Sequence, residues 1–323
     1  MQSIDDKILS IFKERKDAFV SGEELSRILG ISRAGIWKHI QKIKEMGYVV
    51  AASPHLGYQL RAIPDRLIPS EIKYELNTHI IGKEIYTYQV LDSTNSAAEK
   101  LAIEGAEQGI VVIAEGQSKG RGRLGRSWVS PKEKGIYLSV ILRPKIPPSA
   151  TPKVTLIASV ATAMAIRKIS SLPALIKWPN DVFIKNKKIS GILTEISARP
   201  DAIKFLVLGI GINVNTPKEF LPAEATSISE ELGQPINRIA LAKELLRELE
   251  KYYLLFNHKG FECIIKEWQN LSATLGSRVR VVDSENVYEG QAIGIDNTTG
   301  SLIVRKDNGF SCTVLSGDVH ILE

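Results

Sequence analysis

Residues 116–128 read GQSKGRGRLGRSW and lie between two strand-like runs, Ile110–Glu115 and Ile136–Leu142. From Lys119 to Arg126 this stretch carries four basic side chains, three glycines and no acidic residue. Glycines let backbone amides converge on an anion, and guanidinium groups bind phosphate or carboxylate through paired hydrogen bonds. A solvated basic loop or an RGG-like nucleic-acid tether has the same composition. Its place between two strands of a folded domain favours a site for an anionic ligand, which would order this weakly apolar loop.

Three further motifs place polar side chains beside predicted strands and helices. Leu91-Asp-Ser-Thr-Asn95 precedes a helix, where its hydroxyls can cap the helix or bind a polar ring. Lys177-Trp-Pro-Asn-Asp181 can orient a polar ligand or hold Mg²⁺ beside a triphosphate, and Lys188 follows on the next strand. Gly209-Ile-Gly-Ile-Asn-Val-Asn215 ends an apolar strand whose glycines permit close approach and whose Asn213 can contact a nucleotide. Taken singly, either lysine can equally be a solvated surface residue.

Between residues 70 and 271 the sequence mixes strand-like and helix-like segments. Val182–Lys185 and Lys188–Leu193 are separated by only two residues, which predicts an antiparallel hairpin. Adjacent strands of this kind favour an α+β domain with a mixed sheet over a doubly wound parallel one. The other expected strands are Ile85–Leu91, Ile110–Glu115, Ile136–Leu142 and Phe205–Val214, and the expected helices are Glu71–Leu76, Asn95–Glu104, Pro152–Ser170 and Ile239–Phe256.

Residues 1–63 have the pattern of a winged helix-turn-helix domain. Ser21-Gly-Glu-Glu24 predicts a capping box that opens a helix ending at Gly30, and Ser32 caps a second helix. Two short strands, Tyr48–Ala52 and Tyr58–Leu60, would form the wing. The second helix would enter a major groove and contact DNA through Ser32, Arg33, Lys38, Gln41 and Lys42. A small helical interaction domain with solvated lysines is the alternative. The Ile-Pro pairs at 63–64 and 68–69 predict a linker.

Residues 272–323 lack a helical period and alternate as strands. We expect strands near Arg278–Val282, Tyr288–Ile295, Leu302–Arg305 and Phe310–Val314, with turns at Asp296–Gly300 and Asp307–Gly309. This pattern predicts a small β-barrel or meander, closed to avoid exposed edges.

The composition is that of an ordinary globular protein. The 323 residues are 44% hydrophobic and 24% charged, and the net charge of +6 is too small to identify a partner. The most apolar runs, Val154–Ile166 and Phe205–Pro217, are shorter than a bilayer span, and the N-terminus has no signal-peptide pattern, so no membrane partner is expected. Two cysteines and five scattered histidines predict a cytoplasmic protein without an intrinsic metal site.

The motifs GQSKGRGRLGRSW, KWPNDV, Lys188, DSTN and GIGINVN, in that arrangement behind a winged helix, closely resemble the biotin protein ligases. The resemblance is to the bifunctional kind that also represses the biotin operon, and it covers the whole chain. It implies an α+β multidomain protein: a winged helix-turn-helix domain (1–63), a ligase domain with a mixed sheet (70–271) and an SH3-like barrel (272–323).

The resemblance also implies site residues. The biotin-binding set is Ser93, Thr94, Asn95, Gln117, Arg121, Gly122, Arg123 and Lys188, of which Arg123 and Lys188 are catalytic. The ATP or adenylate set is Arg126, Trp128, Asn180 and Asn213. Thr216–Gln234 would cover the nucleotide, but this segment lacks the tryptophan of some relatives, so no adenine-lid residue is assigned.

In the chemistry implied, the biotin carboxylate attacks the α-phosphate of MgATP, giving biotinyl-5′-AMP and pyrophosphate. The carboxylate is already ionised, so this step needs cationic stabilisation rather than a general base. A lysine of a biotin carboxyl carrier protein then attacks the adenylate, with Asp181 as a candidate proton acceptor. Biotin, ATP and Mg²⁺ would be substrates, with no permanently bound cofactor.

The resemblance implies two macromolecular partners besides the carrier: operator DNA and a second copy of this chain. Adenylate binding would favour a homodimer through a surface that includes Gly191–Ile196. Three alternatives stay open at this point: a ligand-sensing regulator without ligase activity, a lipoate ligase, and a ligase whose N-terminal domain no longer binds DNA.

Overall fold

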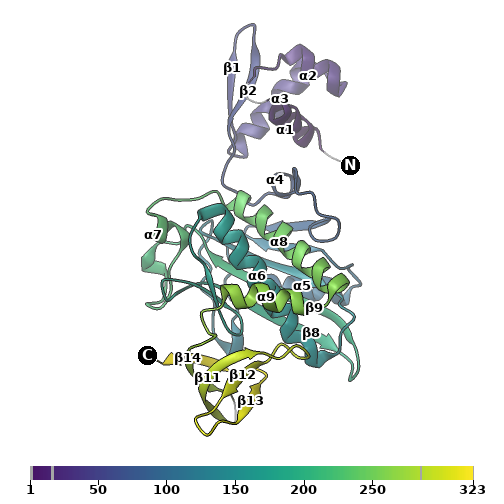
Figure 1. The fold of residues 1–323 in the computed structure, drawn as a ribbon. Helices are drawn as coiled ribbons and strands as arrows, with labels where there is room; N and C mark the ends of the chain where they lie inside the picture. Colours follow the sequence, from purple (N-terminus) through teal and green to yellow (C-terminus); the bar gives the residue numbers. More distant parts are fainter. Residues whose placement is uncertain (1–2, 16–17, 284–285, 323) are drawn as a thin grey trace. The chain divides into compact units, whose positions relative to one another are not determined.

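The structure is a computed structural model in which residues 3–15, 18–283 and 286–322 are described. The chain divides into two compact units, Met1–Arg66 and Leu67–Glu323. Figure 1 shows the three N-terminal helices with their two-stranded hairpin, and the larger sheet-and-helix unit that ends in a small β-sheet.

The N-terminal unit contains α1 (Ile4–Glu14), α2 (Gly22–Leu29), α3 (Arg33–Glu45) and the antiparallel strands β1 (Val49–Ser53) and β2 (Gly57–Ala62). The side chain of Ser32 accepts a hydrogen bond from the Gly35 amide, and Gly30 ends α2 with a φ of 69°. Ile36, Ile40 and Ile43 are fully buried on one face of α3, as their spacing predicts. The helix-turn-helix arrangement and its wing are therefore present.

One local expectation for this unit is wrong. Ser21 does accept from the Glu24 amide, but the Glu24 carboxylate lies 2.8 Å from Arg15 Nη2 rather than on the Ser21 backbone. A reciprocal capping box forms instead at Ser3 and Asp6, the start of α1. The arginine at the end of α1 competes for the glutamate, and sequence spacing alone cannot reveal such a partner.

The larger unit is built on a seven-stranded sheet of order β3-β4-β5-β9-β8-β7-β6. β3 and β4 run parallel and every other neighbouring pair is antiparallel, so the sheet is mixed. The bounds are β3 Ile85–Tyr88, β4 Val111–Ala114, β5 Gly135–Leu142, β6 Leu175–Lys177, β7 Asp181–Ile184, β8 Lys187–Ala198 and β9 Ile203–Asn213.

Helices cover the two faces of this sheet unequally. α6 (Thr151–Ser170), α8 (Arg238–Lys259) and α9 (Glu262–Leu271) bury the main core on one face, and Figure 1 shows α6 and α8 side by side. The opposite face carries α5 (Thr94–Ile103) over a smaller cluster that includes Val207. Because side chains alternate along a strand, every second residue of β5, β8 and β9 points to the α5 side. That side holds the candidate site.

α6 is the core helix of this unit. It has 20 residues, so it is longer than Val154–Ile166, the apolar run judged from the sequence to be too short to span a membrane. By length and mean hydropathy Pro148–Ser170 could cross a bilayer, but 72% of its most apolar window is buried inside the protein. It lies against β8 and α8. Its apolar character is therefore explained by the core.

The C-terminal strands form a five-stranded antiparallel sheet of order β13-β12-β11-β10-β14. Their bounds are β10 Arg278–Val282, β11 Val287–Ile295, β12 Leu302–Arg305, β13 Ser311–Val314 and β14 Asp318–Leu322. The last strand, β14, returns to pair with the first, β10, so the sheet is the small antiparallel barrel or meander that the sequence predicts; among the described residues no ladder joins β13 to β14. Val279 and Leu302 belong to the same hydrophobic cluster as the core of the seven-stranded sheet, which explains why the two domains form one unit.

The sequence misses four short elements of this unit: β6, β14, α7 (Ile228–Leu232) and α9. α4 (Pro69–Lys73) is also shorter than the helix expected there. β6 has three residues and α7 five, too few to display a period.

Candidate functional site

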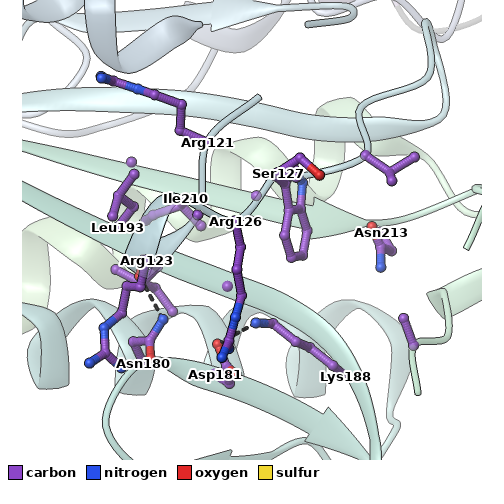
Figure 2. A pocket seen from close by; sticks show the side chains of 18 of the residues that line it. Arg121, Arg123, Arg126, Ser127, Asn180, Asp181, Lys188, Leu193, Ile210 and Asn213 are labelled. Atoms are coloured by element: carbon purple, nitrogen blue, oxygen red, sulfur yellow. Dashed lines mark hydrogen bonds and ion pairs between the residues drawn. The ribbon is translucent and has the colours of Figure 1, made fainter. Parts of the chain in front are cut away.

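A pocket of about 540 Å³ lies on the α5 side of the sheet. Its walls come from the start of α5, the glycine-rich loop, the centres of β8 and β9, and the start of β14. All twelve residues that the sequence proposes for ligand binding line it: Ser93, Thr94, Asn95, Gln117, Arg121, Gly122, Arg123, Arg126, Trp128, Asn180, Lys188 and Asn213. Figure 2 shows the side chains of this wall.

One end of the pocket is polar but uncharged. Ser93 occupies the N-cap position of α5 without making the cap hydrogen bond that the sequence predicts. Gln117 replaces it, because its Oε1 accepts the Thr94 amide at 2.8 Å while its Nε2 donates to Ser130 at 3.0 Å. The start of α5 is thus held by a side chain from the loop, and a helix N-terminus faces the pocket.

The glycine-rich loop forms a short hairpin. The Gly122 amide donates to Arg126 O at 2.7 Å, and the turn between them places Leu124 at a φ of 54° with its side chain exposed. Few apolar contacts stabilise this tip. Its arginines bind elsewhere: Arg123 Nη1 donates to Asn180 Oδ1 at 2.9 Å and to Gly317 O at 3.3 Å.

The other two arginines of the loop point in different directions. Arg126 pairs with Asp318 of β14. Arg121 points away from the cationic cluster in Figure 2, and its Nη2 lies 2.9 Å from Glu195 Oε2 on β8. The loop is therefore attached to the C-terminal sheet on one side and to the seven-stranded sheet on the other.

Lys188 and Trp128 form the centre of the cationic end. Lys188 Nζ lies 2.7 Å from Asp181 Oδ1 and 5.6 Å from the centroid of the Trp128 ring. The ring lies on two glycines paired across β8 and β9: a Cβ on Gly211 would meet the indole nitrogen at 2.5 Å, and one on Gly191 would meet the ring at 3.2 Å. Because the tryptophan covers the sheet, Gly211 has no room for a side chain and Gly191 has little.

Asn213, at the end of β9, supports the segment that follows it. Its Nδ2 donates to Thr226 O at 3.1 Å. Lys188 pairs with the same segment through two backbone hydrogen bonds, to Glu224 O and from the Thr226 amide. Residues of the 216–234 segment, including Leu221 and Ala225, thereby become one wall of the pocket.

The environment of the cationic end shifts two pKa values. Burial lowers the pKa of the Arg123 guanidinium, an effect that Asp318 and Asp181 oppose. Burial likewise lowers the pKa of Lys177, which also lines the pocket, and Asp181 again opposes it. Arginine stays protonated at neutral pH in spite of such a shift. The pocket thus holds partly desolvated cations suited to a phosphate.

No cluster of three or more His, Cys, Asp or Glu side chains that could hold a metal ion occurs among the described residues. Two of the pocket carboxylates, Asp181 and Asp318, have cationic partners. A divalent cation would therefore depend on ligands from a bound phosphate.

The predicted DNA-contacting residues lie on α3 of the N-terminal unit or, for Ser32, at its N-cap. Ser32, Arg33 and Lys38 are exposed, and Gln41 is partly exposed. Lys42 contacts Asp5 of α1 at 2.5 Å.

Asp5 is buried and also lies 2.7 Å from His39. Burial raises the pKa of Asp5, but Lys42 and His39 outweigh it and hold that pKa below its usual value. On α3, Trp37 is 54% exposed, and the sequence alone assigns this residue no role.

Three known families match the chain in order. They are an HTH domain over residues 6–59, the Biotin/lipoate A/B protein ligase family over 87–213, and the Biotin protein ligase C terminal domain over 274–321. The bifunctional ligase/repressor BirA of Bacillus subtilis is 36% identical over 318 residues, 97% of each chain. The chain belongs to the biotin protein ligase family.

Two further relatives of this ligase agree. The bifunctional ligase/repressor BirA of Escherichia coli is 32% identical over 291 residues, which cover 90% of this chain and 89% of that one. The biotin protein ligase of Aquifex aeolicus in complex with biotin and ATP has a TM-score of 0.64 at 30% identity, covering 74% of this chain and 99% of that one. The family resemblance and the fold class expected from the sequence are confirmed.

The biotin ligase pocket also contains residues that the sequence reading missed. Lys177 lines it; the sequence names this lysine within the KWPND motif but assigns it to no binding set. Ser139 on β5 and Glu195 on β8 contact pocket residues but stand in apolar or unremarkable strand sequence. Asp318 comes from another domain, and no local pattern could have placed it.

Proposed function

We propose that this protein forms biotinyl-5′-AMP from biotin and MgATP and transfers the biotin to a lysine of a biotin carboxyl carrier protein. The supporting observation is that one pocket has an uncharged polar end and a cationic end. An uncharged end around Thr94 and Gln117 suits the ureido ring of biotin, and a cationic end around Arg123 and Lys188 suits its carboxylate and the phosphates. Membership of the ligase family supports the same assignment.

The first step brings two anions together, so its barrier is electrostatic. Arg123 and Lys188 act as the catalytic cations: they neutralise the biotin carboxylate and the α-phosphate as the new bond forms, and pyrophosphate leaves. Arg126, Trp128, Asn180 and Asn213 bind the nucleotide or support its binding wall. No proton moves in this step, because the carboxylate is ionised at neutral pH.

In the second step the carrier lysine attacks the carbonyl carbon of the adenylate, and AMP leaves. The attacking ammonium must first lose a proton. Asp181 is our candidate acceptor, since it lines the pocket beside Lys188. The loop from Arg121 to Arg126 keeps water off the mixed anhydride before the carrier arrives. Magnesium enters as part of the substrate MgATP, bound mainly through its phosphates.

We further propose that the adenylate-bound protein represses transcription as a homodimer on operator DNA. α3 would enter the major groove through Arg33, Lys38 and Gln41, and a dimer would present two such helices to a two-fold operator. The ladder between β7 and β8 ends at Gly191, whereas β8 continues to Ala198. The Ile192 amide still donates to Asn180 O, so the edge able to pair with a second copy is that of the described Leu193–Ala198 segment. Two free cysteines and a DNA partner fit a cytoplasmic protein.

The test is the exchange of labelled pyrophosphate into ATP, with biotin and lipoate in parallel. We expect exchange with biotin and little with lipoate. Exchange with lipoate alone would make this a lipoate ligase, and none with either acid would indicate a sensor without ligase activity.

Sedimentation and operator gel shifts test the repressor role. Biotin with ATP should raise the mass to that of a dimer and strengthen operator binding, and Arg33→Ala should weaken it. An unchanged mass would remove the dimer mechanism, and operator binding that ignores Arg33→Ala would count against α3 as the DNA-contacting helix.

A further inference from the structure

Glu195 lies just outside the pocket, on the α5 side of β8, and contacts two pocket residues. Its Oε2 accepts from Asn95 Nδ2 at 2.6 Å and from Arg121 Nη2 at 2.9 Å. The side chain is about a third exposed, 36%, so it is shielded by its partners without being sealed from water.

Asn95 has a second fixed contact. Its Oδ1 lies 2.6 Å from Ser139 Oγ, and the amide group rests on β9, where a Cβ at position 209 would meet Oδ1 at 2.1 Å. A carboxylate accepts hydrogen bonds and cannot donate them, so Glu195 requires the NH₂ of Asn95 to face it. The oxygen of Asn95 must then face Ser139, and the amide has one orientation.

These contacts belong to a chain that crosses the pocket floor. Because Ser139 has a single hydroxyl proton and directs it to Asn95 Oδ1, its Oγ accepts from Thr94 Oγ1, 2.9 Å away. The Thr94 amide donates to Gln117 Oε1 at 2.8 Å. Gln117 Nε2 in turn donates to Ser130 Oγ, and Ser130 Oγ donates to Trp128 O at 3.1 Å. The chain thus starts at Arg121 and returns to the loop at Trp128. Glu195 is the charged acceptor that sets the direction of donors and acceptors along it.

We propose that Glu195 is a positioning residue for the uncharged end of the pocket. It fixes the orientation of Asn95, and through Ser139 that of Thr94, so that a neutral ring with both donors and acceptors meets a single hydrogen-bond pattern. It also holds the Arg121 side chain outside the phosphate-binding end. This inference rests on the proposed function, because the ring it specifies is that of biotin.

Glu195→Gln tests the inference, since glutamine keeps the shape but adds a donor and removes the charge. We expect the KM for biotin in pyrophosphate exchange to rise about tenfold, the equivalent of one charge-assisted hydrogen bond. The KM for ATP, kcat and Tm should stay close to wild type. Glu289→Gln, which removes a glutamate paired with Arg280 on the C-terminal sheet, is the matched control and should change none of them.

A double-mutant cycle separates positioning from general support. In an Asn95→Ala background, Glu195→Gln should add little to the KM for biotin, because the residue it acts through is gone. Additive effects, an unchanged KM in the single variant, or a parallel loss of Tm and of both KM values would overturn the inference. A wild-type protein without biotin-dependent exchange would instead refute the proposed function itself.

Discussion

Arg123→Ala should damage catalysis far more than folding. In the structure its guanidinium makes two hydrogen bonds, to the side chain of Asn180 and to the carbonyl of Gly317, and it belongs to a loop whose tip has few apolar contacts. Truncation removes both bonds but opens no cavity in the hydrophobic core. The stability and activity effects can therefore be worked out separately.

The stability cost is small because water can replace the lost partners. A hydrogen bond of this kind contributes about 1 kcal/mol net, and the two acceptors left behind face an open pocket. We expect a loss of about 1 kcal/mol in the free energy of unfolding. For a unit of this size that is a fall of about 2–4 °C in Tm.

The catalytic cost is larger because the charge acts in a partly desolvated site. Removing one fixed donor at a developing oxyanion typically lowers kcat by about 10²–10³, which is about 3–4 kcal/mol. Burial of Arg123 beside Asn180 places it in this category. We therefore expect exchange of pyrophosphate to fall by at least about a hundredfold.

The assay is biotin-dependent pyrophosphate exchange at saturating biotin and ATP, with calorimetry on the same samples. Arg280→Ala, which removes a half-exposed arginine from the C-terminal sheet, is the control and should leave exchange intact. Two results would refute the reasoning: exchange within about threefold of wild type, or a fall in Tm of about 10 °C that explains the lost activity by unfolding.

Three further outcomes follow from contacts elsewhere. Gly211→Ala should displace Trp128 and raise the KM for ATP about tenfold. Gly294→Ala is the control and should leave this KM unchanged, because its new Cβ has its nearest neighbour at 3.8 Å. Equal KM values in the two variants would contradict the role of Gly211. Asp5→Asn should lower the free energy of unfolding by about 1–2 kcal/mol at pH 7. In urea unfolding the difference from wild type should shrink as the pH falls below 3.8, because the lowered pKa of Asp5 means that only its ionised form is stabilised. A difference that stays constant with pH would argue against this ion pair. Trp37→Ala should weaken operator binding about tenfold with an unchanged salt slope in titrations from low to high salt, because an indole releases no counterions; a changed slope would indicate a role in phosphate contacts.

Sequence reasoning succeeded where a short segment determines its own structure. Ser32 and Gly30 mark the ends of adjacent helices through backbone preferences that need no distant partner, and the structure places both as expected. It failed for Glu24, whose spacing from Ser21 is right for a capping box but whose carboxylate is taken by Arg15. It also missed β14, because a five-residue edge strand is recognisable only beside β10.

The residues of the candidate site were easier to find than their contacts. The glycines of β9 indicate a close approach to the strand, yet the groups that approach are the protein's own: Asn95 at Gly209 and Trp128 at Gly211. Asn95 precedes the glycine-rich loop and Trp128 ends it, so both lie at least 75 residues before β9. Gly209 and Gly211 lie two residues apart and so face the same side of β9, and only the folded sheet brings Asn95 and Trp128 to that side.

The anchoring of the loop explains why a segment so poor in apolar residues has a defined conformation. Arg121, Arg123 and Arg126 each contact a different element, β8, the turn after β6 and the start of β14. Two of these partners are carboxylates, so a phosphate that binds Arg126 must compete with Asp318 for the same guanidinium. The affinity for an anionic ligand is then a difference between two charge-assisted interactions. Removing Asp318 would free Arg126 to bind a phosphate and would raise the affinity for the anionic ligand. It would also break the ion pair that attaches the loop to the C-terminal sheet, so phosphate affinity and loop position are coupled through this one residue pair.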